Sequence, residues 1–364
     1  MAPRIRVIEG GKSLKARQPE QPVFDEQIVG LEPDGAPSAL LARELALSVE
    51  TARAFELKGR AVAQTLSGHF AWGSVAWFFG VLTGVGAVAW AVLNGHMSYW
   101  LSVPIDFILI YGIFATLHEA VHDNIAGRHT KLQWVNGLIG HISGFVLLAP
   151  YPGFRALHLH HHQHTNDPKE DPDYWVKDMS YIRVILRCLV IQPIYIWHLW
   201  KIARNPRIMR AFVWEMVYVA SYIPIIAGAY WLGFGNELIM LWILPAYFGV
   251  CLCPLMFDWP VHHPHTSRDR YEGTAILLFP KPLRPIMEYA FLGHSYHLMH
   301  HLYPRIPFYR YSTAYYALEK DVGIVNGKVV DVGLWPTPSG LVDPARIHSN
   351  ARAADAARAH ANAH

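Results

Sequence analysis

Histidines occur at three places in this sequence with spacings that suit metal binding. These stretches are His118-Glu119-Ala120-Val121-His122, His158-Leu159-His160-His161-His162 and His297-Leu298-Met299-His300-His301. In a helix, residues at i, i+3 and i+4 share one face, so each stretch would present two or three imidazoles together. Neutral imidazoles bind zinc, copper, iron or nickel rather than magnesium or calcium. The spacing therefore predicts a metal site, provided that the fold brings the three stretches together.

The number of histidines indicates how many ions such a site would hold. A single tetrahedral zinc ion takes at most four protein ligands. Eight candidate ligands come from the three stretches, which favours two ions with open positions for an exogenous ligand. They are His118, His122, His158, His161, His162, His297, His300 and His301.

The composition is that of a membrane protein. Of the 364 residues, 52% are hydrophobic and only 16% are charged, which is far more apolar than a soluble domain. A net charge of +3 gives no support to nucleic-acid binding, and three cysteines are too few for a disulfide framework. Residues 1–69 lack the pattern of a signal peptide, so we expect a cytoplasmic N-terminus.

The order of apolar and polar segments predicts an all-α, polytopic membrane fold. We expect a flexible leader over 1–38, an amphipathic interfacial helix over 39–69, a catalytic membrane domain over 70–340 and an alanine-rich tail over 341–364. Within that domain, four segments are long and apolar enough to span a bilayer. These are 70–93, 97–117, 211–232 and 238–257. Residues 134–150 and 181–200 are too short or too polar, which favours re-entrant or interfacial helices.

The distribution of Lys and Arg predicts the orientation of these spans. The connecting loops 94–96 and 233–237 contain neither residue, whereas the segment 118–210 contains many. Cytoplasmic loops carry the excess of positive charge in membrane proteins. We therefore expect all three histidine stretches, and the C-terminus, on the cytoplasmic side as a histidine-rich cap.

In order and spacing, these motifs resemble the three histidine boxes of the integral-membrane fatty acid desaturase and hydroxylase superfamily. The matching patterns are His118-x-x-x-His122, His158-x-x-His161-His162 and His297-x-x-His300-His301, and the resemblance covers about residues 70–320. It implies a centre of two non-haem iron ions, O2 as the oxidant, and a lipid C–H bond as the target. The two electrons would come from a separate ferredoxin, rubredoxin or cytochrome with its reductase, because no haem-binding or CxxC pattern is fused to the sequence.

Two local stretches are most similar to the carotenoid β-ring hydroxylases within that superfamily. One is His164-Thr165-Asn166-Asp167 followed by Asp171-Pro172-Asp173, and the other runs from Tyr296 to Phe308. The chain departs from those hydroxylases at His294, where they carry Gln. Hydroxylation, desaturation and oxidative decarboxylation of a free fatty acid to a terminal alkene all remain open.

The resemblance also implies a ninth ligand at the end of the fourth span. His262 occupies that place, with Asp258 one turn earlier, although a helix break at Pro260 would turn His263 or His265 inward instead. Polar residues beside the boxes are expected to orient the ligands through hydrogen bonds. These are Asp258, His164, Asp123 and Asp173. Glu119, Asp167 and Asp171 also lie beside the boxes, where they could accept from ligand N–H groups or be charges of solvated loops.

A carboxylate inside a predicted span, Asp106, presents two alternatives. A charged residue within the bilayer is costly and usually faces the interior of the helix bundle, where Asp106 could line the far end of a substrate tunnel. Equally, its side chain could reach toward the opposite membrane interface.

Two other classes of protein compete with an oxygenase. A zinc-dependent membrane hydrolase needs only three ligands and a general base, which leaves most of the histidines unexplained. A metal carrier predicts ionisable residues through several spans, whereas only Asp106 and Glu215 occur inside the four.

Overall fold

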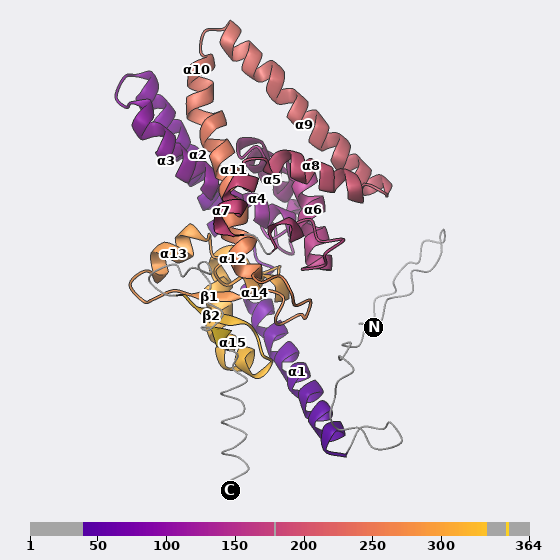
Figure 1. Cartoon of the computed structure of the whole chain (residues 1–364). Coiled ribbons are helices and arrows are strands. Elements are labelled where there is room, and N and C mark those ends of the chain that lie inside the picture. The colour runs from indigo at the N-terminus through magenta and orange to yellow at the C-terminus, as the bar shows by residue number, and fades with distance from the viewer. Residues whose placement is uncertain (1–38, 178–179, 333–346, 349–364) are drawn as a thin grey trace. The chain divides into compact units, whose positions relative to one another are not determined.

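The structure is a computed structural model that describes residues 39–177, 180–332 and 347–348 (Figure 1). The chain divides into two compact units, Met1–Glu50 and Thr51–His364. The described part of the first unit is the beginning of helix α1, Ala39–Leu66, which continues into the second unit. The predicted leader lies outside the described residues, as does the predicted tail apart from residues 347–348. Every predicted site residue belongs to the second unit.

Four helical segments are long and apolar enough to cross a membrane, which confirms the four predicted spans. They are α2 (Trp72–Leu93), the segment Tyr99–Val121, α9 (Pro206–Trp231) and the segment Gly235–His262. The second segment consists of α3 (Tyr99–Gly112) and α4 (Phe114–Val121). The fourth consists of α10 (Gly235–Leu238), the π-helical turn η3 (Ile239–Ile243), α11 (Leu244–Phe257) and α12 (Trp259–His262). Both of these spans extend beyond the predicted ends and carry histidines at their C-terminal ends.

Two pairs of shorter helices bend sharply at the segments predicted to be re-entrant or interfacial. Helix α5 (Trp134–Val146), preceded by η1 (Thr130–Leu132), makes an angle of 102° with α6 (Tyr151–His164). Helices α7 (Tyr181–Cys188) and α8 (Ile191–Ile202) meet at 80°. The histidines at the ends of α4 and α6 lie together. The chain between them, which includes α5, therefore returns to the place where α4 ends, and this supports a re-entrant path for α5 and α6.

Close packing at two glycines fixes the bend between α5 and α6. A Cβ atom on Gly144 would lie 2.6 Å from the backbone oxygen of Ala149 and 2.7 Å from the backbone nitrogen of Tyr151. A Cβ atom on Gly140 would lie 2.9 Å from the Cβ of Ala120 on α4. Only glycine lets α5 approach both neighbours this closely.

The C-terminal part of the described chain adds short elements around the third histidine stretch. They are β1 (Ile276–Leu278), α13 (Arg284–Ala290), α14 (His297–Leu302), η4 (Phe308–Arg310), α15 (Tyr311–Ile324), β2 (Val329–Asp331) and β3 (Ile347–His348). One further short element, η2 (Tyr174–Val176), lies earlier in the chain, before α7. β1 pairs in parallel with β2, and β2 pairs antiparallel with β3. This small sheet was not predicted, but it leaves the fold predominantly helical.

The sheet holds α14 in position through the backbone. The backbone N–H of Leu277 donates to the carbonyl of Ser295 at 2.7 Å, and Leu298 donates to Ala275 at 3.3 Å. Both contacts flank His297, the first residue of α14. The strand β1 therefore fixes the start of the third histidine stretch.

We predict that Gly144→Ala destabilises the protein by about 1–3 kcal/mol, because the added methyl group meets backbone atoms that cannot move independently. Gly137→Ala in the same helix is the matched control, since a Cβ atom there has no neighbour within 4 Å. Thermal unfolding in detergent measures both variants. Equal melting temperatures for the two would contradict the tight bend.

Candidate metal centre

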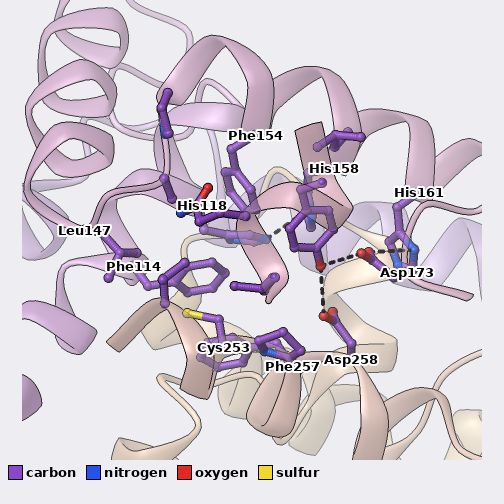
Figure 2. Close-up of a pocket in the computed structure, with 18 of the residues that line it drawn as sticks. Phe114, His118, Leu147, Phe154, His158, His161, Asp173, Cys253, Phe257 and Asp258 are labelled. Atoms are coloured by element: carbon purple, nitrogen blue, oxygen red, sulfur yellow. Dashed lines mark hydrogen bonds and ion pairs between the residues drawn. The ribbon is translucent and has the colours of Figure 1, made fainter. Parts of the chain in front are cut away.

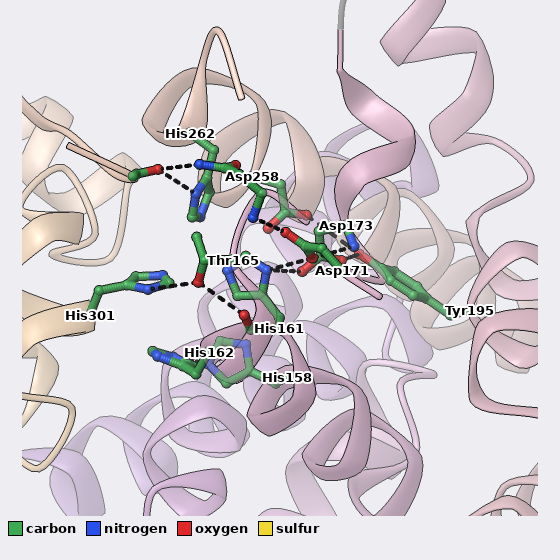
Figure 3. Close-up of polar contacts among 12 residues, drawn as sticks. His158, His161, His162, Thr165, Asp171, Asp173, Tyr195, Asp258, His262 and His301 are labelled. Atoms are coloured by element: carbon green, nitrogen blue, oxygen red, sulfur yellow. Dashed lines mark hydrogen bonds and ion pairs between the residues drawn. The ribbon is translucent and has the colours of Figure 1, made fainter. Parts of the chain in front are cut away.

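The fold brings nine histidines together in two adjacent groups, and several of them are labelled in Figures 2 and 3. Every predicted ligand is among them, which agrees with the spacing argument, and each group combines residues from different helices. The first group contains His118 and His122 from the end of α4, His158 from α6 and His300 from α14. We include His162 of α6 in it because its Nε2 atom contacts those of His158 and His300, although His162 also adjoins His301 of the second group. The second contains His161 from α6, His262 from α12, and His297 and His301 from α14.

Helices α6 and α14 each contribute to both groups. On α6, His158 and His162 belong to the first group and His161 to the second. On α14, His300 belongs to the first group and the other two histidines to the second. Histidines on one face of a helix therefore need not bind the same ion. The spacing alone did not decide this question.

The ring nitrogens of the first group converge. The Nε2 atom of His158 lies 3.0 Å from that of His118, 3.0 Å from that of His122 and 3.1 Å from that of His162. The Nε2 atom of His300 lies 3.2 Å from that of His118 and 2.8 Å from that of His162. Five nitrogens thus make five close contacts.

The second group repeats this arrangement. The Nε2 atom of His297 lies 3.1 Å from that of His262 and 3.1 Å from that of His301. The His161 ring lies 4.8 Å from the His262 ring and 5.2 Å from the His301 ring, measured between centroids. The nitrogens of all four residues lie within 4.8 Å of one another.

Hydrogen bonds between the rings cannot account for these contacts. A nitrogen of a neutral imidazole has either one proton or one lone pair, so it takes part in one hydrogen bond at most. The five nitrogens of the first group can then form only two hydrogen bonds among their five contacts. A cation that accepts every lone pair removes the conflict, and two nitrogens bound at right angles about 2.1 Å from one ion would lie about 3.0 Å apart. The donor set therefore fits a metal ion in each group.

Hydrogen bonds at Nδ1 turn the Nε2 atoms toward the centre. The Nδ1 of His161 lies 2.8 Å from a carboxylate oxygen of Asp171 and 3.2 Å from one of Asp173. The Nδ1 of His300 lies 2.9 Å from the Tyr311 hydroxyl, and that of His262 lies 3.3 Å from the Gly273 carbonyl. Such contacts fix the orientation of a ligand ring.

Burial keeps the histidines of α14 in the neutral form that metals bind. Desolvation lowers the pKa of His297, His300 and His301 well below the usual value, and the surrounding imidazoles lower the pKa further. Metal binding requires the unprotonated ring, so no proton has to be displaced from these three rings at neutral pH.

Of the three candidates for the ninth position, His262 lies in one of the two groups. Although the helix breaks at Asp258, α12 restarts immediately and turns His262 toward the second group. His263 and His265 are in none of the groups found among the described residues. His265 is nevertheless buried, with no hydrogen-bond partner for either ring nitrogen within the described chain.

Of the four polar residues predicted to orient the ligands, some lie at the histidines and others have different partners. Asp173 contacts His161, and the Tyr195 hydroxyl donates to Asp173 at 2.7 Å and to Asp258 at 3.4 Å (Figure 3). By contrast, Asp123 pairs with Arg155 at 3.0 Å.

His164, the fourth of these residues, packs against His160 with ring centroids 4.4 Å apart and lies in neither group. Asp171, a further acidic candidate beside the second stretch, contacts His161. Tyr195 and Tyr311 were missed, and Tyr311 lies in a different helix from the ring it contacts.

An apolar pocket opens directly on the histidines (Figure 2). The histidines at its wall are His118, His158, His161 and His297, together with His294. The His294 ring stands 4.5 Å from the His118 ring, and its Nδ1 donates to the Leu292 carbonyl at 2.9 Å. The remaining wall is mostly apolar and includes Phe114, Leu147, Phe154, Leu157, Ile191, Val250, Cys253 and Phe257.

Asp106 is fully buried, so its side chain faces the protein interior. Neither of its carboxyl oxygens has a hydrogen-bond partner among the described residues. It is not among the residues that line the apolar pocket. The role of Asp106 in a substrate tunnel stays a prediction.

Taken together, four helices able to span a membrane, clustered histidines and an apolar pocket define an integral-membrane protein with a candidate metal centre. Residues 95–324 match the fatty acid desaturase family, so the chain belongs to that family and is an oxidoreductase.

Three relatives illustrate the family's range. The chain is 25% identical to the sn-1 oleoyl-lipid 12-desaturase of Picosynechococcus sp., over 68% of this chain and 78% of the relative. It is 25% identical to the sn-1 acyl-lipid omega-3 desaturase (ferredoxin) of Nostoc sp., over 63% and 70%. It is 26% identical to the dihydrorhizobitoxine desaturase of Bradyrhizobium elkanii, over 58% and 66%.

We predict that the purified protein binds two metal ions per chain, one for each group of histidines. His161→Ala removes a ring from the second group only, so we expect it to lose about one of the two ions. His160→Ala on the same helix is the matched control, because His160 contacts Glu170 at 3.6 Å instead. Elemental analysis of the purified variants measures the metal content. Equal losses in the two variants would contradict the assignment.

Proposed function

We propose that this protein is a di-iron enzyme that uses O2 to oxidise an unactivated C–H bond of a lipid acyl chain. The observation that carries the proposal is the position of the two histidine groups at the wall of an apolar pocket. Two iron ions, bound by His118, His122, His158, His162 and His300 and by His161, His262, His297 and His301, would supply the activation of O2.

The residues of the pocket would bind and orient the hydrocarbon. Phe114 stacks on Phe257 with ring centroids 4.5 Å apart, and Phe154 stands 5.5 Å from Phe114. These rings and the His294 side chain line the pocket beside His118. Holding a saturated carbon against the histidines, away from water, favours reaction of that carbon over wasteful side reactions.

Desaturation of an acyl chain is the first choice among the possible outcomes. Two of the relatives described above are named for desaturation of lipids, one as an oleoyl-lipid and one as an acyl-lipid desaturase, and none of those three is named a carotenoid hydroxylase. In a desaturation the substrate gives up two hydrogen atoms, and O2 is reduced to two molecules of water with two further electrons and two protons from a donor. Hydroxylation and oxidative decarboxylation to an alkene are the alternative outcomes of the same site.

A ferredoxin is the first candidate for the electron donor, because one relative is named for it. A second, polar pocket reaches the site beside His162 and His301. Arg268 and Arg270 line this pocket and would favour an acidic protein. A rubredoxin or a cytochrome with its reductase would serve the same role.

Cells that express the chain with a ferredoxin system test the proposed reaction. We expect an acyl product two mass units lighter than the fatty acid supplied, formed only under oxygen, and carrying no label when the oxygen is 18O2. A labelled product would indicate hydroxylation of an acyl chain or of β-carotene, and an alkene one carbon shorter would indicate decarboxylation. His300→Ala is the inactive control. Absence of any oxygen-dependent product from iron-loaded protein would contradict the proposal.

The orientation of the protein in the membrane also belongs to this proposal. The positive charge of segment 118–210 supports a cytoplasmic location for the histidines and both termini, where a soluble donor could reach them. We therefore expect loop 94–96 on the opposite side.

Labelling of introduced cysteines by a membrane-impermeant maleimide tests this orientation, because Cys188, Cys251 and Cys253 are all buried. Asn94→Cys should react in intact cells, and Lys131→Cys only after the cells are permeabilised. The reverse pattern would place the histidines outside the cytoplasm.

A further inference from the structure

Glu215 is an acidic residue inside the membrane-spanning helix α9 that the histidine site does not use. Its side chain is buried, with only 6% of the residue exposed. Its Oε2 atom has no hydrogen-bond partner among the described residues. Within a bilayer, such groups face the interior of the helix bundle or a cavity and are usually functional.

The carboxyl group of Glu215 borders the apolar pocket that contains the histidines. Helix α6 accommodates it at Gly153, where a Cβ atom would lie only 2.1 Å from Oε2 of Glu215. The same Cβ atom would lie 3.0 Å from the Cδ2 atom of Leu199, which belongs to α8. A glycine on the helix that carries the second histidine stretch thus leaves room for this carboxyl group.

A buried acceptor without a donor destabilises a protein unless a ligand supplies the donor. Asp106 is also buried and unpartnered, but it does not line the pocket. Of these two intramembrane carboxyl groups, only that of Glu215 is placed to meet a molecule in the pocket.

We infer that Glu215 binds the polar end of the substrate, accepting a hydrogen bond from an O–H or N–H group. This inference rests on the proposed function, because it assigns the pocket to the substrate. The substrate class is then a single-chain amphiphile that ends in a hydroxyl, a carboxylic acid or an amine, with its hydrocarbon part against the aromatic wall.

The position of Glu215 also determines which carbons reach the histidines. Gly153 precedes His158 by five residues on α6. This corresponds to a rise of about 7.5 Å, or roughly six methylene groups of an extended chain. We therefore expect oxidation within about six carbons of the polar end rather than near the methyl end of the chain.

Three matched substrates test the inference: dodecanol, dodecanoic acid and methyl dodecanoate, each supplied to the iron-loaded protein with its donor system. We expect products modified within roughly the first six carbons of the alcohol and the acid. The ester, which has no donor group, should react more slowly and at scattered positions. Mass spectrometry of the products locates the modified carbon.

Three variants examine the carboxyl group of Glu215 directly. Glu215→Leu should lose the preference for dodecanol over the ester, by roughly fivefold for a single hydrogen bond, while the ester reacts as before. Gly153→Ala should reproduce this loss, because its methyl group displaces the carboxyl group while Glu215 itself remains. Glu215→Gln retains an acceptor and should keep the preference. Glu237→Gln, at a glutamate outside the pocket, is the matched control.

Binding of radiolabelled dodecanol provides a measurement that does not depend on turnover. Weaker binding in Glu215→Leu and Gly153→Ala, with binding retained in Glu215→Gln, supports the inference even for an inactive preparation. Products oxidised only in the half of the chain nearer the methyl end, or equal loss of all substrates in Glu215→Leu, would overturn it while leaving the proposed function intact. Absence of any oxidised product, together with specific dodecanol binding, would overturn the proposed function alone.

Discussion

The structure depends on a group of imidazole nitrogens that face one another at about hydrogen-bond distance but cannot all be hydrogen-bonded. The Nε2 atom of His158 has three such neighbours within 3.1 Å, yet it has a single proton or a single lone pair. Buried lone pairs that converge without donors raise the free energy of the fold, and bound cations lower it. Metal binding and the stability of this part of the fold are therefore coupled.

Several elements act together to hold that arrangement. Helix α6 is fixed at its histidines by Asp171 and Asp173, and α14 by strand β1 and by the Tyr311 hydroxyl. Because both helices contribute to both groups, a shift of either helix would change both metal sites at once. The apolar pocket lies against the same helices. The helices that position the histidines would therefore also position the proposed substrate.

The sequence was sufficient to predict the spans and the three histidine stretches that the fold brings together, because both depend on local periodicity. Membrane thickness requires long apolar helices, and the i, i+3, i+4 spacing places imidazoles on one face. The choice of His262 over His263 and His265 was beyond this reasoning, since it depends on how α12 restarts after Asp258.

The parts that could not be predicted involve contacts between distant segments. β1 and β2 are three residues each and lie about fifty positions apart, so neither has a recognisable pattern of its own. The contacts of Tyr311 with His300 and of Gly153 with Glu215 join different helices. Such pairings follow from packing, which a single sequence does not specify.

Anomalous diffraction from crystals of the iron-loaded protein, measured above and below the iron absorption edge, tests the central claim most directly. We expect two peaks, one among His118, His122, His158, His162 and His300 and the other among His161, His262, His297 and His301. A single peak, or a metal bound away from these side chains, would contradict the claim that the histidines form two iron sites.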